Sequence, residues 1–247
     1  MLRYALHDYS NKSATTTTCP QRFVFMQLKP TFTFLSGLAK NNERPWFQER
    51  KATYDQLRAQ FEEDAEFLFR ELAKLDPELA GPGGRKSLFR IYRDVRFSKN
   101  KDPYKTHFSA YFTASAGKEI EAPGYYLQLG PNGQTMIAGG LYMPDKAQLA
   151  AIRQEIDYNA HELKAILDAP DFRRYFGTMG GDKLKKSPAA YSVEHPEIEL
   201  LKHKSFTATH QMADAEVLSH DDFRAYALEG FRVMVPFCQF LRGAIEV

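Results

Sequence analysis

The sequence predicts an α+β fold: a mainly antiparallel sheet of about five strands, packed by a long N-terminal helix and a C-terminal helix. Three observations predict it. Apolar residues recur at helical spacing over residues 43–74 and again over residues 220–241. Between these stretches, apolar and polar residues alternate in short segments separated by turn residues, as in antiparallel strands. No linker interrupts the pattern, so we expect one domain over residues 26–247.

The N-terminal 25 residues differ from the rest of the chain. They mix Asn, Ser, a Thr15–Thr18 run and scattered aromatic residues, with neither helical nor strand periodicity. We expect residues 1–25 to be a poorly ordered extension. Two interpretations stay open: Met26 is the true start, or the segment is a variable tail.

Two helices are expected next. Phe32–Lys40 predicts a short amphipathic helix, and Asn42 predicts the N-cap of the following one. One face of that long helix, residues 43–74, carries apolar residues three, four or seven positions apart. These are Phe47, Tyr54, Leu57, Phe61, Ala65, Leu68 and Leu72.

Alternation then predicts the strands. Residues 89–97 and 107–114 should form one hairpin, residues 125–129 and 135–142 a second, and residues 205–212 a fifth strand. The polar faces carry several aromatic residues, which a wholly solvated face would not need. The side chains expected on these faces include His107, Tyr111, Tyr126 and Gln128.

Helices are expected over most of the remaining chain. Residues 145–168 predict a helix broken near Asp157, and residues 170–176 a short one. The spacing Ser219-x-x-Asp222 resembles a capping box that opens a last helix over residues 223–239, with a kink at Pro236.

Composition limits the classes of function. The chain has 247 residues, 43% of them hydrophobic, and a formal net charge of only +2. Such a weak field gives no strong reason to expect a membrane or nucleic acid as partner; we expect no membrane and leave nucleic acid open. Cys19 and Cys238 lie far apart without metal-ligand spacing, so we expect no metal and no cofactor. Without a secretory or membrane-spanning apolar run, a cytoplasmic location is expected.

One segment concentrates charge. Between Arg90 and His107, six residues are Arg or Lys and two are Asp. The alternating apolar residues predict a charged strand with Arg93 on its apolar face, where an unpaired charge would be costly. The alternating residues are Phe89, Ile91, Val95 and Phe97.

This segment also carries a resemblance. The spacing Arg90-x-x-Arg93-Asp94-x-Arg96-Phe97-x-x-Asn100-Lys101-x-x-Tyr104 resembles the signature of the family called domain of unknown function 2461. Further similarity lies in Phe34-Leu35-x-x-Leu38-x-x-Asn41-Asn42, Trp46-Phe47, Pro123-Gly124-Tyr125-Tyr126, Gly139-Gly140 and Lys183-Leu184-Lys185. The resemblance covers nearly everything from about Phe32 onward. It implies one domain and no catalytic assignment.

The charged segment leads to three hypotheses. In the first, it binds a phosphate- or carboxylate-bearing small molecule, because Arg and Lys exceed Asp there. The ligand-binding candidates are Arg90, Arg93, Arg96 and Lys101 for charge, Asp94 to orient the arginines, and Tyr104 and Tyr126 as walls. In the second, an enzyme acts on an anionic substrate at the same site, with His107 or Asp94 as base.

In the third hypothesis, the arginines form an ion-pair staple within a structural or protein-interaction module. The discriminating observation is whether His107 and Arg96 share one cavity or face apart.

Overall fold

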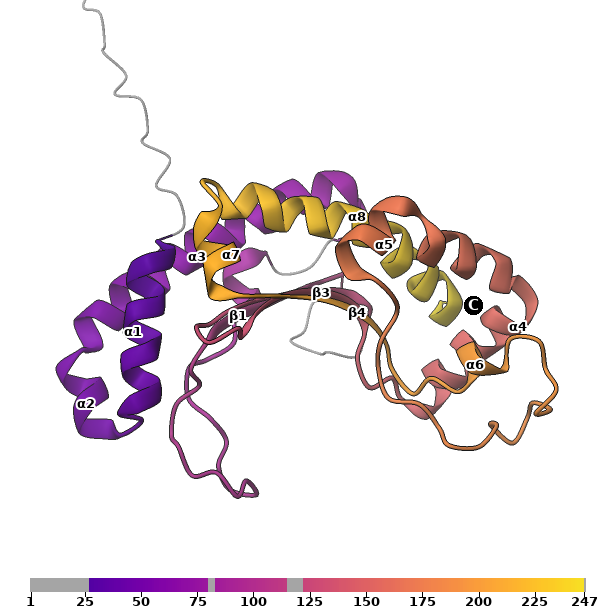
Figure 1. Cartoon of the computed structure of the whole chain (residues 1–247), viewed down its shortest axis with the longest axis horizontal. Coiled ribbons are helices and arrows are strands. Elements are labelled where there is room, and N and C mark those ends of the chain that lie inside the picture. The colour runs from indigo at the N-terminus through magenta and orange to yellow at the C-terminus, as the bar shows by residue number, and fades with distance from the viewer. Residues whose placement is uncertain (1–26, 80–82, 115–121, 247) are drawn as a thin grey trace, which may run out of the picture.

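A computed structural model of the protein describes residues 27–79, 83–114 and 122–246. The expectations for residues 1–25, Met26 and Cys19 lie outside these residues. At the centre is one antiparallel sheet whose strands lie side by side in chain order (Figure 1). The strands are β1 (Phe108–Thr113), β2 (Gly124–Leu129), β3 (Thr135–Leu141) and β4 (Phe206–Met212). The α+β fold, the second hairpin and the last strand are confirmed.

The charged segment predicted as the first strand is not a regular strand. Its backbone forms only isolated bridges, between Leu88 and Ala110 and between Tyr92 and Tyr104. The sheet therefore has four strands in the described residues instead of about five. A physical reason is that the segment extends beyond the sheet, where no layer covers it, and that Pro103 opposite has no N–H to donate.

Helices cover one face of the sheet. α3 (Lys51–Leu75) and α8 (Phe223–Ile245) pack on the strands, and Figure 1 shows both above the sheet, whose lower face carries no helix in the described part of the chain. The other helices lie at the sides or behind this layer. They are α1 (Leu28–Lys40), α2 (Arg44–Glu49), α4 (Lys146–Asp168), α5 (Pro170–Phe176), α6 (Ile198–Leu201) and α7 (Asp214–Ser219), with a 3-10 turn η1 at Gly84–Ser87.

The long N-terminal helix is divided. Arg50, with φ −111° and ψ 14°, leaves the helical conformation and separates α2 from α3. The predicted N-cap at Asn42 is wrong, because Glu43 occupies the cap position and the Asn42 side chain bonds elsewhere. The predicted apolar stripe from Phe47 to Leu72 is confirmed, since each of its residues is buried.

The later helices follow the prediction with corrections at their ends. α4 has a kink at Asn159, two residues beyond the expected break near Asp157. The Asp222 side chain, not Ser219, caps α8 by accepting the backbone N–H groups of Arg224 and Ala225. α8 also continues as helix through Pro236 to Ile245, six residues beyond the predicted end.

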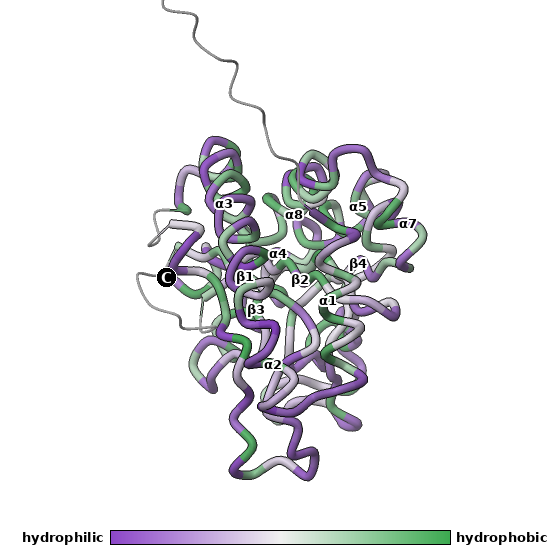
Figure 2. The backbone as a smooth tube through the Cα atoms, turned by 90° about the vertical axis from the view of Figure 1, so that its left-hand side faces the viewer, coloured by the Kyte–Doolittle hydropathy of each residue, from purple (hydrophilic) through white to green (hydrophobic). Residues whose placement is uncertain are grey.

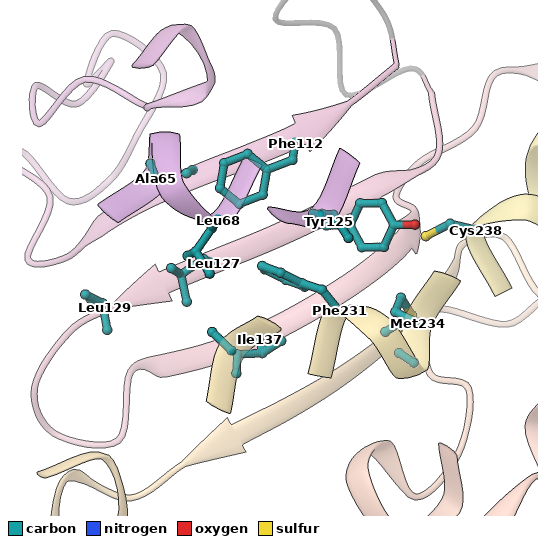
Figure 3. Close-up of a cluster of buried hydrophobic side chains, with 14 of the residues drawn as sticks. Ala65, Leu68, Phe112, Tyr125, Leu127, Leu129, Ile137, Phe231, Met234 and Cys238 are labelled. Atoms are coloured by element: carbon teal, nitrogen blue, oxygen red, sulfur yellow. The ribbon is translucent and has the colours of Figure 1, made fainter. Parts of the chain in front are cut away.

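The core lies between the helices and the covered sheet face. In Figure 3, Phe112, Tyr125 and Ile137 of the sheet point toward Phe231 and Met234 of α8. Close packing explains one glycine: a Cβ on Gly139 would lie 2.6 Å from Met234 Cγ. Gly139 therefore lets α8 approach β3 closely, and substitution there would force the two apart.

A buried ion pair joins the far ends of the two covering helices. Asp76, directly after α3, accepts hydrogen bonds from Arg242 Nη2 at 2.6 and 2.7 Å and from the Tyr125 hydroxyl at 2.5 Å. Arg242 Nε also donates to Glu78 at 2.7 Å. Both Asp76 and Arg242 are buried, so removing Arg242 would leave the charge of Asp76 in the core without this cationic partner.

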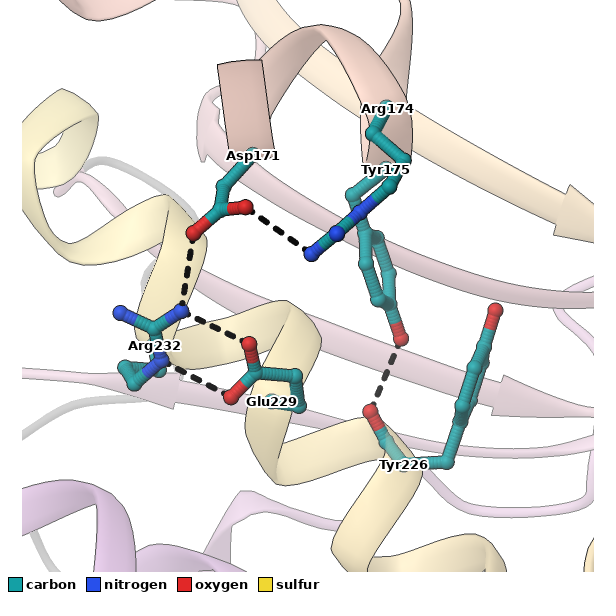
Figure 4. A network of polar contacts seen from close by, with 6 residues as sticks. All are labelled: Asp171, Arg174, Tyr175, Tyr226, Glu229 and Arg232. Carbon is teal, nitrogen blue, oxygen red and sulfur yellow. Dashed lines mark hydrogen bonds and ion pairs between the residues drawn. The ribbon is translucent and has the colours of Figure 1, made fainter. Parts of the chain in front are cut away.

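A surface network ties α5 to α8 (Figure 4). Asp171 accepts hydrogen bonds from Arg174 at 2.9 Å and from Arg232 of α8 at 3.3 Å, and Arg232 also pairs with Glu229. The Tyr175 hydroxyl donates to the backbone carbonyl of Tyr226 at 2.8 Å. These contacts fix α5 against α8.

Candidate functional site

On one face of the sheet, no helix of the described residues covers the side chains. Residues alternate between the faces of each strand, so those opposite the core residues point to the open side. The register places Tyr111 opposite Tyr126, Tyr126 opposite Ala138, and Ala138 opposite Thr209. One row of open-face side chains therefore crosses the sheet from β1 to β4.

A cavity of about 440 Å³ lies over this row. We call it the open-face cavity. Its volume falls in the range of small-molecule sites, roughly 300–1,000 Å³. It is lined by Phe89, Lys105, His107, Ser109, Tyr111, Tyr126, Met136, Ala138, Gly139, Gly140, Tyr142, Thr207 and Thr209.

Aromatic rings form its walls. The Phe89 ring stands edge-on to Tyr126, with centroids 6.3 Å apart. The Tyr126 hydroxyl donates to Gln128 Oε1 at 2.7 Å, and the Tyr111 hydroxyl donates to the Ala122 carbonyl at 2.6 Å. Because these hydroxyls are held by the protein, Tyr111 and Tyr126 are oriented before any ligand binds.

One end of the cavity carries a positive charge. Lys105 is the one charged side chain among the described lining residues, and its Nζ lies 4.9 Å from the centroid of the Phe89 ring. Burial lowers the pKa of Lys105, and the positive charge of Arg90 lowers it further. A lysine partly stripped of water gains more from an anion than an exposed lysine does.

His107 lies at the same end and lacks a charge at neutral pH. Burial lowers its pKa to about 4, the neighbouring Lys105 contributes in the same direction, and a hydrogen bond with Gln134 opposes both. Polar groups at the other side of the cavity are available to a ligand. The hydroxyls of Thr207 and Thr209 have no hydrogen-bond partner among the described residues.

The charged segment leaves the sheet beside this cavity. Its two halves pair through backbone bonds from Lys105 N to the Ile91 carbonyl and from Arg93 N to the Pro103 carbonyl. We call residues 90–105 the basic arm. In Figure 1 and in Figure 2 it projects downward, on the side opposite α3 and α8.

The predicted strand faces do not persist along the basic arm. Ile91 is buried, but Phe97 is 96% exposed, so the apolar face ends after the first residues. Arg93 is not buried on that face either. Its side chain is 26% exposed and donates to the Asp102 carbonyl and to Ser98 Oγ.

The predicted arginine fork is paired internally at its centre. Arg96 binds Asp94 through Nη2 at 2.6 Å and Nε at 3.0 Å, and these bonds lower the pKa of the carboxyl to about 2. Lys101 donates to the Val95 carbonyl at 2.9 Å. Arg90 is exposed and has no hydrogen bond or ion pair within the described ranges.

Tyr104 is not a cavity wall. It is 2% exposed and stacks on Phe47 with centroids 4.2 Å apart. The Asn42 side chain holds its backbone, accepting from Tyr104 N and donating to the Tyr104 carbonyl, both at 3.0 Å. Asn42 and Tyr104 therefore fix the base of the basic arm to the N-terminal helices.

Of the predicted site residues, Tyr126 and His107 line the open-face cavity, whereas Arg96 and Asp94 do not. Two lining residues do not follow from the sequence pattern: Lys105 resembles part of a solvated turn, and the alternation predicts Phe89 on the apolar face of a strand. A usable signal was the alternation His107, Ser109, Tyr111. The remaining lining residues come from strands whose register no local pattern specifies.

The described residues hold no group of three or more His, Cys, Asp or Glu side chains placed to bind a metal ion. Among the helices of this part of the chain, none combines the length and the hydrophobicity that a membrane-spanning helix needs.

Comparison with known proteins identifies the family. Neither the curated proteins nor the solved structures contain a match to this chain. The sequence model of the family described as conserved hypothetical protein (DUF2461) matches residues 30–240. These residues include α3, most of α8, the four strands of the described sheet, the basic arm and the residues that line the open-face cavity. The chain therefore belongs to the DUF2461 family.

Proposed function

We propose that the protein binds a small molecule with a flat apolar body and an anionic group, in the open-face cavity. The observation that carries this proposal is the pairing of aromatic walls, Phe89 and Tyr126, with a partly buried Lys105 at one end. An aromatic or apolar body would lie against the rings, and a phosphate or carboxylate would pair with Lys105. The proposed anion-binding residue is therefore Lys105, whereas the sequence hypothesis names the arginines of the basic arm.

Binding is favoured over acid–base catalysis by the state of His107. An efficient general base has a pKa near the working pH, and the pKa of His107 is about 4. The other predicted base, Asp94, is exposed on the basic arm and pairs with Arg96. No Asp or Glu occurs among the described residues that line the cavity.

A thermal-shift comparison with matched compounds tests the proposal. Phenyl phosphate and benzoate carry a ring and an anion, whereas benzyl alcohol carries the ring alone. A ligand that binds only the folded state raises the melting temperature, by about 3 °C at ten times Kd for a chain of this size. We expect this rise with the two anions, at fixed ionic strength, and a smaller one with benzyl alcohol.

Two variants locate the effect. Ala138→Phe fills the centre of the cavity and should abolish the response to all three compounds, while Lys105→Gln should remove the advantage of the anions. The matched controls are Ala147→Phe on the exposed side of α4 and Lys40→Gln on α1, which should respond like the wild type. A response that Ala138→Phe leaves unchanged would show that the compounds bind elsewhere.

A further inference from the structure

The basic arm concentrates the positive charge of the molecule. Residues 90–105 contain six Arg or Lys and two Asp, a net charge of +4, whereas the whole chain carries +2. The remaining residues are therefore net negative. A local surplus of this kind on a projecting segment attracts a polyanion, although the molecule as a whole is nearly neutral.

Much of this charge is free to act on a partner. Neither Arg90 nor Lys99 makes an ion pair or side-chain hydrogen bond with any residue that the structure describes. Arg93 reaches the Asp102 carboxylate only at 4.0 Å, and Lys101 binds a carbonyl instead of a carboxylate. The two carboxylates of the arm, Asp94 and Asp102, therefore neutralise only part of its positive charge.

An aromatic side chain lies at the tip among these cations. Phe97 is 96% exposed, and the Arg96 guanidinium lies 5.8 Å from the centroid of its ring. A phenylalanine so fully in water contributes nothing to the folding core. Exposed rings beside Arg and Lys are the combination by which proteins bind single-stranded nucleic acid, since rings stack on bases and cations pair with phosphates.

The arm and the open-face cavity form one continuous surface. Lys105 ends the arm and lines the cavity, and Phe89, directly before Arg90, forms a cavity wall. We infer that the basic arm and the open-face cavity together bind single-stranded nucleic acid. Phosphates lie along Arg90, Arg93 and Lys99, one base stacks on Phe97, and another enters between Phe89 and Tyr126. The base in the cavity rests on the proposed function.

A membrane surface fits this geometry less well. In Figure 1 the segments on both sides of the sheet extend below its lower face, so a planar surface could not lie flat against the face that carries the cavity. A planar bilayer that touched Phe97 would not reach the cavity, and the cations Arg90 and Lys105 at the base of the arm would stay unused. A flexible single strand reaches both.

Fluorescence anisotropy with labelled oligonucleotides of about twelve deoxythymidines or uridines tests the inference, because sites of this kind span about 4–16 nucleotides. We expect binding that weakens with salt. Arg90→Gln combined with Lys99→Gln should reduce the salt slope by about 1.4, since each lost phosphate contact removes about 0.7 on a single strand. Phe97→Ala should weaken binding on the order of tenfold with an unchanged melting temperature.

The matched control removes the same charge elsewhere. Arg70→Gln combined with Lys74→Gln, both exposed on α3, should leave affinity and salt slope unchanged. An equal loss in this control, or no binding at low salt, would overturn the inference. So would binding of phosphatidylserine vesicles that depends on Phe97 without any binding of oligonucleotides.

Two outcomes separate this inference from the proposed function. If phenyl phosphate binds but the arm variants bind oligonucleotides like the wild type, the proposed function stands and the nucleic-acid inference is wrong. If the arm variants weaken oligonucleotide binding while no small anion binds and Ala138→Phe has no effect, the arm binds nucleic acid and the proposed cavity function is wrong.

Discussion

Lys105 and His107 are two positions apart, like neighbouring residues on one face of a strand, and both line the open-face cavity. Their surroundings nevertheless leave Lys105 charged and His107 neutral. Both side chains are partly buried, and burial disfavours the charged form of each. Lys105 stays charged and can pair with an anion, because the ordinary pKa of a lysine lies far above neutral. His107 becomes neutral, so the positive charge in the cavity is confined to Lys105.

The lowered pKa of His107 has a consequence for stability. Because the folded-state pKa of about 4 lies below the ordinary 6.5, the unfolded chain binds more protons between these values. The contribution of His107 is therefore fully present above about pH 7 and is lost as the pH falls toward 4. From pH 8 to pH 5 we expect a loss of about 2 kcal/mol from this group.

Denaturant unfolding of the wild type and of His107→Gln at both pH values measures this loss. Burial raises the pKa of Asp64 on α3 to about 7, so this group acts in the opposite direction, but it is present in both proteins and cancels in the comparison. His161→Gln, on the exposed side of α4, serves as control and should follow the wild type. Equal pH dependence in all three proteins would contradict the buried, neutral state of His107.

Single residues of the site were predictable only where strand alternation holds. Tyr126 and His107 follow from the alternation of residues 107–113 and 125–129, which the structure keeps. Lys105 and Phe89 could not be assigned to the cavity from the sequence. Both lie where the arm joins the sheet, and there the alternation of side chains between two faces is lost. The buried state of Tyr104 depends on Phe47, 57 positions away, which no local pattern reveals.

Among the elements, the basic arm depends most on contacts from elsewhere in the chain. It has few backbone hydrogen bonds of its own, and the Asn42 side chain supplies two more by bonding both polar backbone groups of Tyr104. Asn42 lies between α1 and α2, so the N-terminal helices set where the arm leaves the sheet.

Asn42→Ala should loosen the arm without unfolding the protein. Loss of both bonds should cost about 1–3 kcal/mol and raise the hydrogen-exchange rates of the Tyr104 and Lys105 amides. Asn41→Ala is a matched control, because the side chain of Asn41 donates to the Gly37 carbonyl of α1 and has no hydrogen bond to the arm among the described residues. If both variants exchanged alike at Tyr104, the Asn42 contact would not fix the arm.

The helices were predicted well and the arm was not, for a physical reason. A helix such as α3 buries one stripe, so its apolar residues repeat every three or four positions and can be read from the sequence. The basic arm buries only its base, and its alternation from Phe89 to Phe97 does not correspond to two faces of a sheet. The break at Arg50 has no turn residue to mark it.

At the scale of the whole molecule, the two faces of the sheet differ in what lies against them. α3 and α8 bury one face, and the buried Asp76–Arg242 pair links the C-terminal ends of these two helices. The side chains of the other face line the open-face cavity, and the basic arm projects beside it. The α+β class followed from the sequence, but which face stays open depends on how the helices pack.

The most direct test of the account is a crystal structure of the protein soaked with phenyl phosphate. The account predicts the ring between Phe89 and Tyr126, with a phosphate oxygen about 2.8 Å from Lys105 Nζ, the usual length of a charged hydrogen bond. Phosphate bound only among Arg90, Arg93 and Arg96, with no compound in the open-face cavity at saturating concentration, would contradict it.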